Sequence, residues 1–195
     1  MFAEERGVEL EIESISLREK AHLTPELLAK NPFGQVPVLE LPTGACIAES
    51  MAICRYLDET TPGPSLFGVD PVARALIHMW SRRVEAGIFV PAVDLGHHGH
   101  PYFRHTFEQV PEIARVCRAT LEQTYARVDA ALAETEYIGG DALSVADLVA
   151  VCGVELARLW RCAPGSALVH LERWYTAVSA RPSAAFARYE QVADP

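Results

Sequence analysis

Pro37 stands just inside a stretch, residues 36–41, whose apolar pattern predicts a β-strand. Proline cannot donate a hydrogen bond to a strand ladder, so a central strand rejects it. A cis Val36–Pro37 bond would turn the Val36 backbone outward, where it could pair with an extended peptide ligand. A trans proline at a strand edge explains the same residues, and the motif alone leaves both interpretations open.

A Glu49-Ser50 pair opens the next predicted helix. The first turn of a helix carries free N–H groups and a partial positive charge, which together hold a carboxylate. The Ser50 hydroxyl could add a donor and Glu49 could take an ammonium, so the pair suits an α-amino acid end with both charges. Taken alone, the pair is better explained by Ser50 capping the helix and Glu49 being solvated, since serine caps are common.

Three cations precede the proline motif. Lys20, His22 and Lys30 could each bind a second carboxylate at the far end of a short peptide. Each of them, considered singly, is also explained as a solvated surface charge.

The elements that must position these residues mix strands and helices. Val8, Leu10 and Ile12 alternate with glutamates, which is the period of a strand with one wet face. Thr24 followed by proline predicts a helix start, and a proline after Asn31 predicts its end. The expected elements are a strand over 8–15, a helix over 24–31, strands over 36–41 and 45–48, and a helix from Ser50.

The second part of the chain shows only helical patterns. A proline-rich linker is expected over 61–70, and amphipathic helices from Pro71 onward. Ser144 and Asp147 form a variant capping box before a largely apolar helix. We therefore expect an α/β domain over 1–60, a linker over 61–70 and an all-helical domain over 71–195.

Composition excludes several classes of protein. Half of the 195 residues are apolar and the net charge is −9, which argues against nucleic acid or an anionic membrane as the main partner. No apolar run reaches the roughly 20 residues of a membrane span, and no signal peptide is evident. The five cysteines lack C-x-x-C or zinc-ligand spacing, so we expect reduced core thiols in a cytoplasmic protein.

Residues 31–50 resemble the N-terminal domain of the glutathione S-transferases, where a Gln-Val-Pro turn with a cis proline and a Glu-Ser pair bind glutathione. Residues 137–147 resemble the helical-domain signature of that family, in which Asp147 would be a buried structural cap. Residues 181–183 resemble its C-terminal ending. The resemblance implies a thioredoxin-like domain followed by an all-helical domain.

The resemblance also implies which residues bind glutathione. Val36, before cis-Pro37, would pair its backbone with the cysteinyl part, and Glu49 and Ser50 would hold the γ-glutamyl end. His22 would bind the glycyl carboxylate, with Gln35 nearby and Lys20 as a second candidate. The implied glutathione-binding residues are thus His22, Gln35, Val36, Pro37, Glu49 and Ser50.

The implied activity is conjugation of the glutathione thiolate to small hydrophobic electrophiles, a detoxification reaction in a cytoplasmic homodimer. The helix after Ser50 would pair with the helix from Val72 across the two-fold axis. No further cofactor and no metal are implied. Candidate walls of the electrophile site are Trp80, Ile88, Phe89, Tyr102 and Phe103. The alternative is a non-catalytic binding or assembly module with the same fold.

The start of the chain departs from the family pattern. Residues 1–7 look like the end of the family's first helix, with Gly7 as its stop. The first strand and the usual catalytic Ser, Tyr or Cys are therefore missing from this sequence. Either the sequence starts at an internal methionine, the protein has repacked, or a partner supplies the strand; the first account is the simplest.

A histidine-rich segment, residues 96–101, is the second departure. Its glycines predict a loop, which lacks the rigid spacing that metal ligands need, so we expect no metal site. The resemblance implies that His98 or His97 acts through a water on the glutathione thiol. An exposed polar loop is the alternative explanation.

Overall fold

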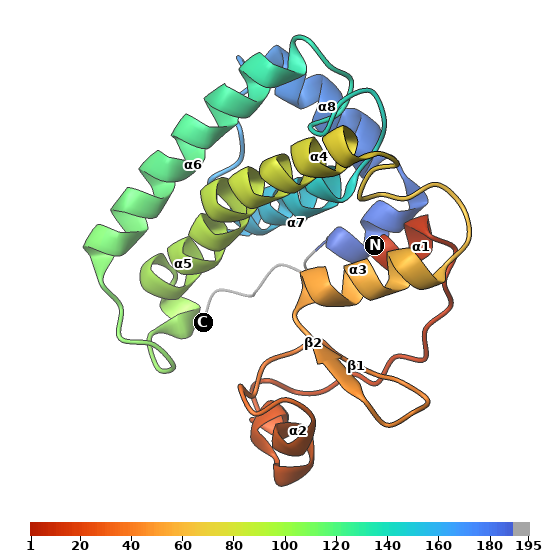
Figure 1. The fold of residues 1–195 in the computed structure, drawn as a ribbon. Coiled ribbons are helices and arrows are strands. Elements are labelled where there is room, and N and C mark those ends of the chain that lie inside the picture. The colour runs from red at the N-terminus through yellow and green to blue at the C-terminus, as the bar shows by residue number, and fades with distance from the viewer. Residues whose placement is uncertain (189–195) are drawn as a thin grey trace. The chain divides into compact units, whose positions relative to one another are not determined.

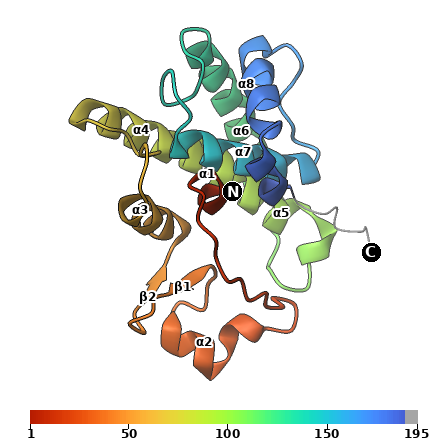
Figure 2. The same ribbon diagram turned by 90° about the vertical axis from the view of Figure 1, so that its right-hand side faces the viewer.

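The computed structural model describes residues 1–188. The chain forms two compact units, one over Phe2–Gly63 and one from Pro64 onward that also includes Met1. Figures 1 and 2 show the elements of both units. Within residues 1–188, no helix has the length and apolar character that crossing a bilayer requires.

The unit over Phe2–Gly63 contains three α-helices, one 3₁₀ turn and a hairpin. Gly7, at φ +64°, ends the first helix as its sequence predicts. The Thr24 hydroxyl accepts a hydrogen bond from the Leu27 N–H at 3.4 Å, which confirms the predicted helix cap. The helices are α1 (Phe2–Glu5), a 3₁₀ turn (Ala21–Leu23), α2 (Pro25–Lys30) and α3 (Ser50–Thr60).

Two three-residue strands form the sheet of this unit. β1 (Val38–Glu40) and β2 (Cys46–Ala48) pair antiparallel, with Val38 opposite Ala48. In both views the hairpin lies between α2 and α3 (Figures 1 and 2), and α3 contacts both strands.

The strand expected over residues 8–15 is not formed. The side chain of Ile12 is 74% exposed and that of Leu10 39% exposed. Alternation of apolar residues predicts which face of a strand is wet, but a strand also needs a ladder partner. Within residues 1–188 this segment pairs with no strand, and it has no regular secondary structure.

The second unit is entirely helical in the part that the structure describes. Asp70 begins its first helix by accepting hydrogen bonds from the N–H groups of Val72 and Ala73, at 2.8 and 2.9 Å. The elements are α4 (Pro71–Val84), a π-helical segment (Glu85–Phe89), α5 (Val90–Gly99), a 3₁₀ turn (Pro101–Phe103), α6 (Pro111–Leu132), α7 (Val145–Leu159), α8 (Val169–Ser179) and a final 3₁₀ segment (Pro182–Ala187).

Part of the segment expected to be a glycine-broken loop is helical. Gly96, His97, His98 and Gly99 form the last turn of α5. A Cβ on Gly96 would lie 2.6 Å from the Trp160 ring, so only glycine lets the two helices approach this closely. Tertiary packing therefore overrides the poor helix propensity of glycine here.

Buried Asp147 organises the core of the helical unit. Its Oδ2 accepts hydrogen bonds from the backbone N–H and the hydroxyl of Ser144, at 2.9 and 2.8 Å. Its Oδ1 accepts from the Ile138 N–H and from Trp174 Nε1, both at 2.8 Å. The expected role of Asp147 as a buried structural cap is confirmed.

Candidate functional site

The register of the hairpin brings the proline motif and the Glu-Ser pair to one end of the sheet. Val38 opposes Ala48 in an antiparallel ladder. Pro37 therefore enters β1 at the same end at which Glu49 leaves β2. Residues separated by a dozen positions in the sequence are neighbours at this end, which we call the hairpin end (Val36, Pro37, Glu49 and Ser50).

The Val36–Pro37 peptide bond is cis, as the resemblance to the Gln-Val-Pro turn of the glutathione S-transferases implied. The side chain of Val36 is 42% exposed. Its backbone N–H and carbonyl make no hydrogen bond with any residue of the described chain. An exposed backbone with an unpaired donor and acceptor can take an extended peptide as an added strand.

Asn31 fixes the turn that leads into this bond. Its side chain donates a hydrogen bond from Nδ2 to the Gln35 carbonyl at 2.8 Å and accepts one from the Phe33 N–H at 3.2 Å. Asn31 is only 5% exposed. The sequence analysis treated Asn31 only as the end of a helix and missed this second role. The feature that could have revealed it is an asparagine just before the proline turn, because its amide can both donate and accept hydrogen bonds.

Glu49 has a strained backbone, at φ 70° and ψ 120°. Positive φ is uncommon for a residue with a Cβ and recurs at functional sites. Ser50 is the first residue of α3, and neither side chain hydrogen-bonds to another described residue. The interpretation of Ser50 as a simple cap therefore finds no support, because the cap position belongs to Glu49 and no capping bond forms.

The three candidate cations differ in their surroundings. Lys30 Nζ lies 2.7 Å from Glu40 Oε2, and hydrogen bonding to this carboxylate raises the pKa of Lys30. Lys20 is exposed at φ 58°. His22 is half-buried, and its Nδ1 is enclosed without a hydrogen-bond partner among the described residues. A buried ring nitrogen without a partner carries the cost of an unpaired polar group, and a neutral imidazole has a second ring nitrogen that can bond elsewhere.

The histidines of the helical unit are partly engaged by their own unit. His98 Nδ1 accepts a hydrogen bond from the Val110 N–H at 3.2 Å, which fixes the ring and leaves Nε2 for other chemistry. His97 stacks on Phe107 with ring centroids 4.0 Å apart, and burial lowers the pKa of His97. Gln109 Nε2 donates to the carbonyl of His97 at 2.8 Å and so holds the segment in place.

The candidate walls of an electrophile site also differ. Ile88 is completely buried in the helical core, whereas Tyr102 is 45% exposed. Phe103 packs edge-on against Trp160 with centroids 5.9 Å apart. Within residues 1–188, no group of three or more His, Cys, Asp or Glu side chains is arranged to hold a metal ion.

Comparison with known proteins identifies two domains in the chain. A family model described as the N-terminal domain of glutathione S-transferases matches residues 1–60. A second, described as the C-terminal domain of glutathione S-transferases, matches residues 95–182.

Individual relatives agree with these matches. Glutathione S-transferase 2 of Saccharomyces cerevisiae is 34% identical over 171 residues, which is 87% of this chain and 73% of the yeast protein. A solved glutathione S-transferase domain-containing protein of Marinobacter aquaeolei VT8 is 34% identical, with a TM-score of 0.87 over 93% of this chain and 91% of that one. Elongation factor 1-gamma 3 of Oryza sativa subsp. japonica is 28% identical over 93% of this chain and 43% of its own length. The chain belongs to the glutathione S-transferase family.

Proposed function

We propose that this protein binds glutathione at the hairpin end and conjugates its thiolate to small hydrophobic electrophiles. The observation that carries the proposal is the meeting of the unpaired Val36 backbone, the strained Glu49 and the N-terminus of α3 in one unit. This arrangement offers a strand edge for a peptide and separate groups for the two charges of an α-amino acid end.

Each part of glutathione has a matching group. The Val36 N–H and carbonyl pair with the cysteinyl backbone. The Ser50 hydroxyl and the first N–H groups of α3 hold the γ-glutamyl carboxylate, while the Glu49 carboxylate takes the γ-glutamyl ammonium. His22, with Gln35 nearby, serves the glycyl carboxylate, because its imidazole is half-buried and an imidazole N–H can donate to a carboxylate.

The chemistry requires a thiolate, which is the nucleophile. We assign the proton acceptor to His98, with His97 as a second candidate. The thiol proton passes to His98 Nε2 through a water, the sulfur lone pair forms the new S–C bond, and the electrophile's leaving group departs with its bonding electrons. His98 is the better candidate, since its Nδ1 is anchored by Val110 and its Nε2 stays available, whereas His97 is stacked on Phe107.

Calorimetry with reduced glutathione, followed by turnover with 1-chloro-2,4-dinitrobenzene, tests the proposal. We expect saturable binding and formation of the dinitrophenyl conjugate. Absence of glutathione binding at millimolar concentration would contradict the assignment of the hairpin end.

A non-catalytic binding or assembly module is the second candidate. It is favoured by the match to proteins named elongation factor 1-gamma, which covers 93% of this chain. Binding of glutathione without turnover of any electrophile would favour this candidate over the transferase. In either case we propose a cytoplasmic homodimer.

A further inference from the structure

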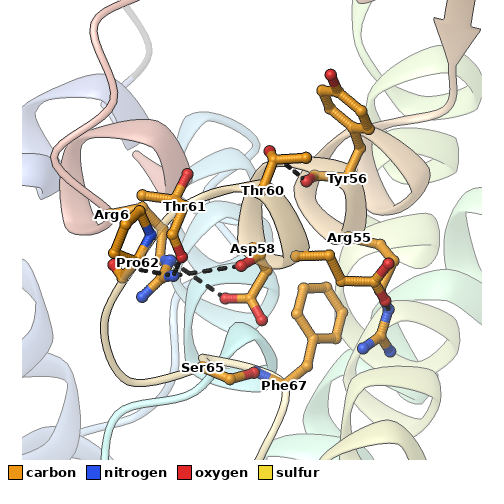
Figure 3. Close-up of polar contacts among 10 residues, drawn as sticks. Arg6, Arg55, Tyr56, Asp58, Thr60, Thr61, Pro62, Ser65 and Phe67 are labelled. Atoms are coloured by element: carbon orange, nitrogen blue, oxygen red, sulfur yellow. Dashed lines mark hydrogen bonds and ion pairs between the residues drawn. The ribbon is translucent and has the colours of Figure 1, made fainter.

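A buried ion pair ties the first helix of the Phe2–Gly63 unit to the last turn of α3. Arg6 Nε lies 3.2 Å from Asp58 Oδ1, and each side chain is 4% exposed. Figure 3 shows the guanidinium beside the carboxylate and the chain that follows α3. The two residues are 52 positions apart in the sequence.

Arg6 also binds backbone carbonyls at the same helix end. Its Nη2 donates to the carbonyls of Thr61 at 2.6 Å, Asp58 at 3.3 Å and Pro62 at 3.5 Å. The last carbonyls of a helix have no partner within the helix and carry partial negative charge. One guanidinium therefore neutralises Asp58, caps α3 and fixes the chain that leaves it.

Within its unit, α3 is held at both ends. Among the elements of this unit, its main contacts are with α1 and the two short strands, and it follows the strained Glu49. A strained residue persists where the surrounding structure over-determines its conformation. The N-terminus of α3, with Ser50, is held through β2, so the direction of the helix depends on what holds its other end.

We propose that Arg6 and Asp58 are positioning residues for glutathione, which fix the direction of α3 and thereby aim its N-terminus at the γ-glutamyl end. This inference rests on the proposed function. Neither residue touches the ligand; both act through Ser50 and the N–H groups of the first turn of α3. The pair therefore controls affinity for one end of glutathione rather than the reactivity of its sulfur.

Two mild variants test the pair. Arg6→Lys keeps the charge but loses the fork that reaches several acceptors at once. Asp58→Asn keeps the shape of the side chain and leaves the contacts of Arg6 with the backbone carbonyls. It is therefore the variant that tests the ion pair if Arg6→Lys does not fold. We expect each to weaken glutathione binding by about tenfold, the low end of the range for losing one hydrogen bond to a charged group.

Arg173→Lys is the matched control. Arg173 caps α6 as Arg6 caps α3, with Nη2 donating to the carbonyls of Leu132 at 2.8 Å and Thr135 at 2.9 Å. It belongs to the helical unit, so its loss should lower the thermal midpoint without changing the affinity for glutathione.

Calorimetry with glutathione and with cysteinylglycine, which lacks the γ-glutamyl end, gives a readout that a general loss of structure would not give. Because only the γ-glutamyl contacts are affected, glutathione should weaken by about tenfold while cysteinylglycine keeps its parent affinity, whereas a loss of binding-competent protein would weaken both ligands by the same factor. If the folded variants Arg6→Lys and Asp58→Asn bind glutathione as tightly as the parent, or if both ligands weaken equally, the inference is overturned and the proposed function is not. A parent protein that does not bind glutathione overturns the proposed function as well.

Discussion

Trp174 donates a 2.8 Å hydrogen bond from its indole Nε1 to Oδ1 of Asp147, and both side chains are completely buried. The bond joins α8 to the N-terminus of α7. The same carboxylate accepts from Ile138 and Ser144, so one side chain organises three segments of the helical unit.

We expect Asp147→Asn to lower the free energy of unfolding by about 2–4 kcal/mol, because an amide presents a donor where the site supplies only donors. Urea denaturation followed by circular dichroism measures the change. Asp141→Asn, the same substitution at an exposed residue, is the control and should stay within about 0.5 kcal/mol of the parent. Equal stability of the two variants would show that Asp147 is not the organising group.

Glu49→Gly should raise the stability of the protein and lower its affinity for glutathione. Glycine adopts positive φ without a steric penalty, so relief of the φ 70° strain should stabilise the protein by about 1 kcal/mol or more. The same change removes the carboxylate that we assign to the γ-glutamyl ammonium, so glutathione affinity should fall by about 10- to 150-fold. Ser50→Ala should weaken binding over the same range without the gain in stability.

Thermal unfolding and calorimetry on the same samples measure both quantities. Glu49→Gln is the control that keeps the shape and the strain and removes only the charge. If Glu49→Gly and Ser50→Ala both bind glutathione as tightly as the parent, the γ-glutamyl end is not held at the hairpin end.

Local sequence signals predicted much of what surrounds the hairpin end. Thr24 before a proline predicted the start of α2, and the resemblance of the Gln-Val-Pro turn to that of the family predicted the cis bond at Val36–Pro37. These features depend on neighbours within a few positions, and turn and cap chemistry is specified over that range.

Features that depend on distant partners were not predictable in this way. The alternation over residues 8–15 indicated a strand, but periodicity carries no information on whether a ladder partner is present. Gly96 indicated a loop, and its contact with Trp160 is visible only in the folded chain. The Arg6–Asp58 pair joins positions 52 residues apart, and no local pattern marks either of them.

Ionisation of Tyr175 should lower the stability of the protein at alkaline pH. Burial, together with its hydrogen bond to the Glu155 carboxylate, raises the pKa of Tyr175 to about 12. Its folded pKa lies above the unfolded value of about 10, so the stability that it contributes is complete below pH ~10 and is lost as the pH rises through ~12.

Ultraviolet titration of tyrosinate and unfolding at several alkaline pH values check this expectation. Tyr175→Phe should remove a late step from the titration and flatten the decline of stability between pH ~10 and ~12. Tyr102→Phe, at a more exposed position, is the control. A Tyr175→Phe curve identical to that of the parent would mean that the Glu155 contact does not perturb the phenol.

Exposed apolar residues on α4 support a homodimer. Val72 is 68% exposed and Leu76 is 45% exposed one turn later, on one face of the helix. We expect light scattering at micromolar protein to give the mass of two chains, and Leu76→Glu to give one, because two-fold symmetry would bury an unpaired carboxylate in the interface twice, once from each chain. Val169→Glu, at an exposed apolar residue of α8, should leave the dimer intact. A monomeric parent would exclude the proposed dimer.

His98→Asn is the sharpest test of catalysis by the chain as it stands. The Asn side-chain oxygen can take the place of His98 Nδ1 and accept from the Val110 N–H, so the variant should keep its local structure. It lacks the Nε2 to which we assign the thiol proton. General-base help is typically worth about 10²- to 10⁴-fold, so turnover with 1-chloro-2,4-dinitrobenzene should fall by that factor while calorimetric affinity for glutathione stays at the parent value. His97→Asn tests the second candidate, because it removes an imidazole of the same helical turn whose ring is stacked on Phe107. We expect a smaller loss of turnover than in His98→Asn, and a larger one would move the assignment to His97. Full turnover in the triple replacement of His97, His98 and His100 would end the assignment of the base to this segment and leave thiolate formation to another group.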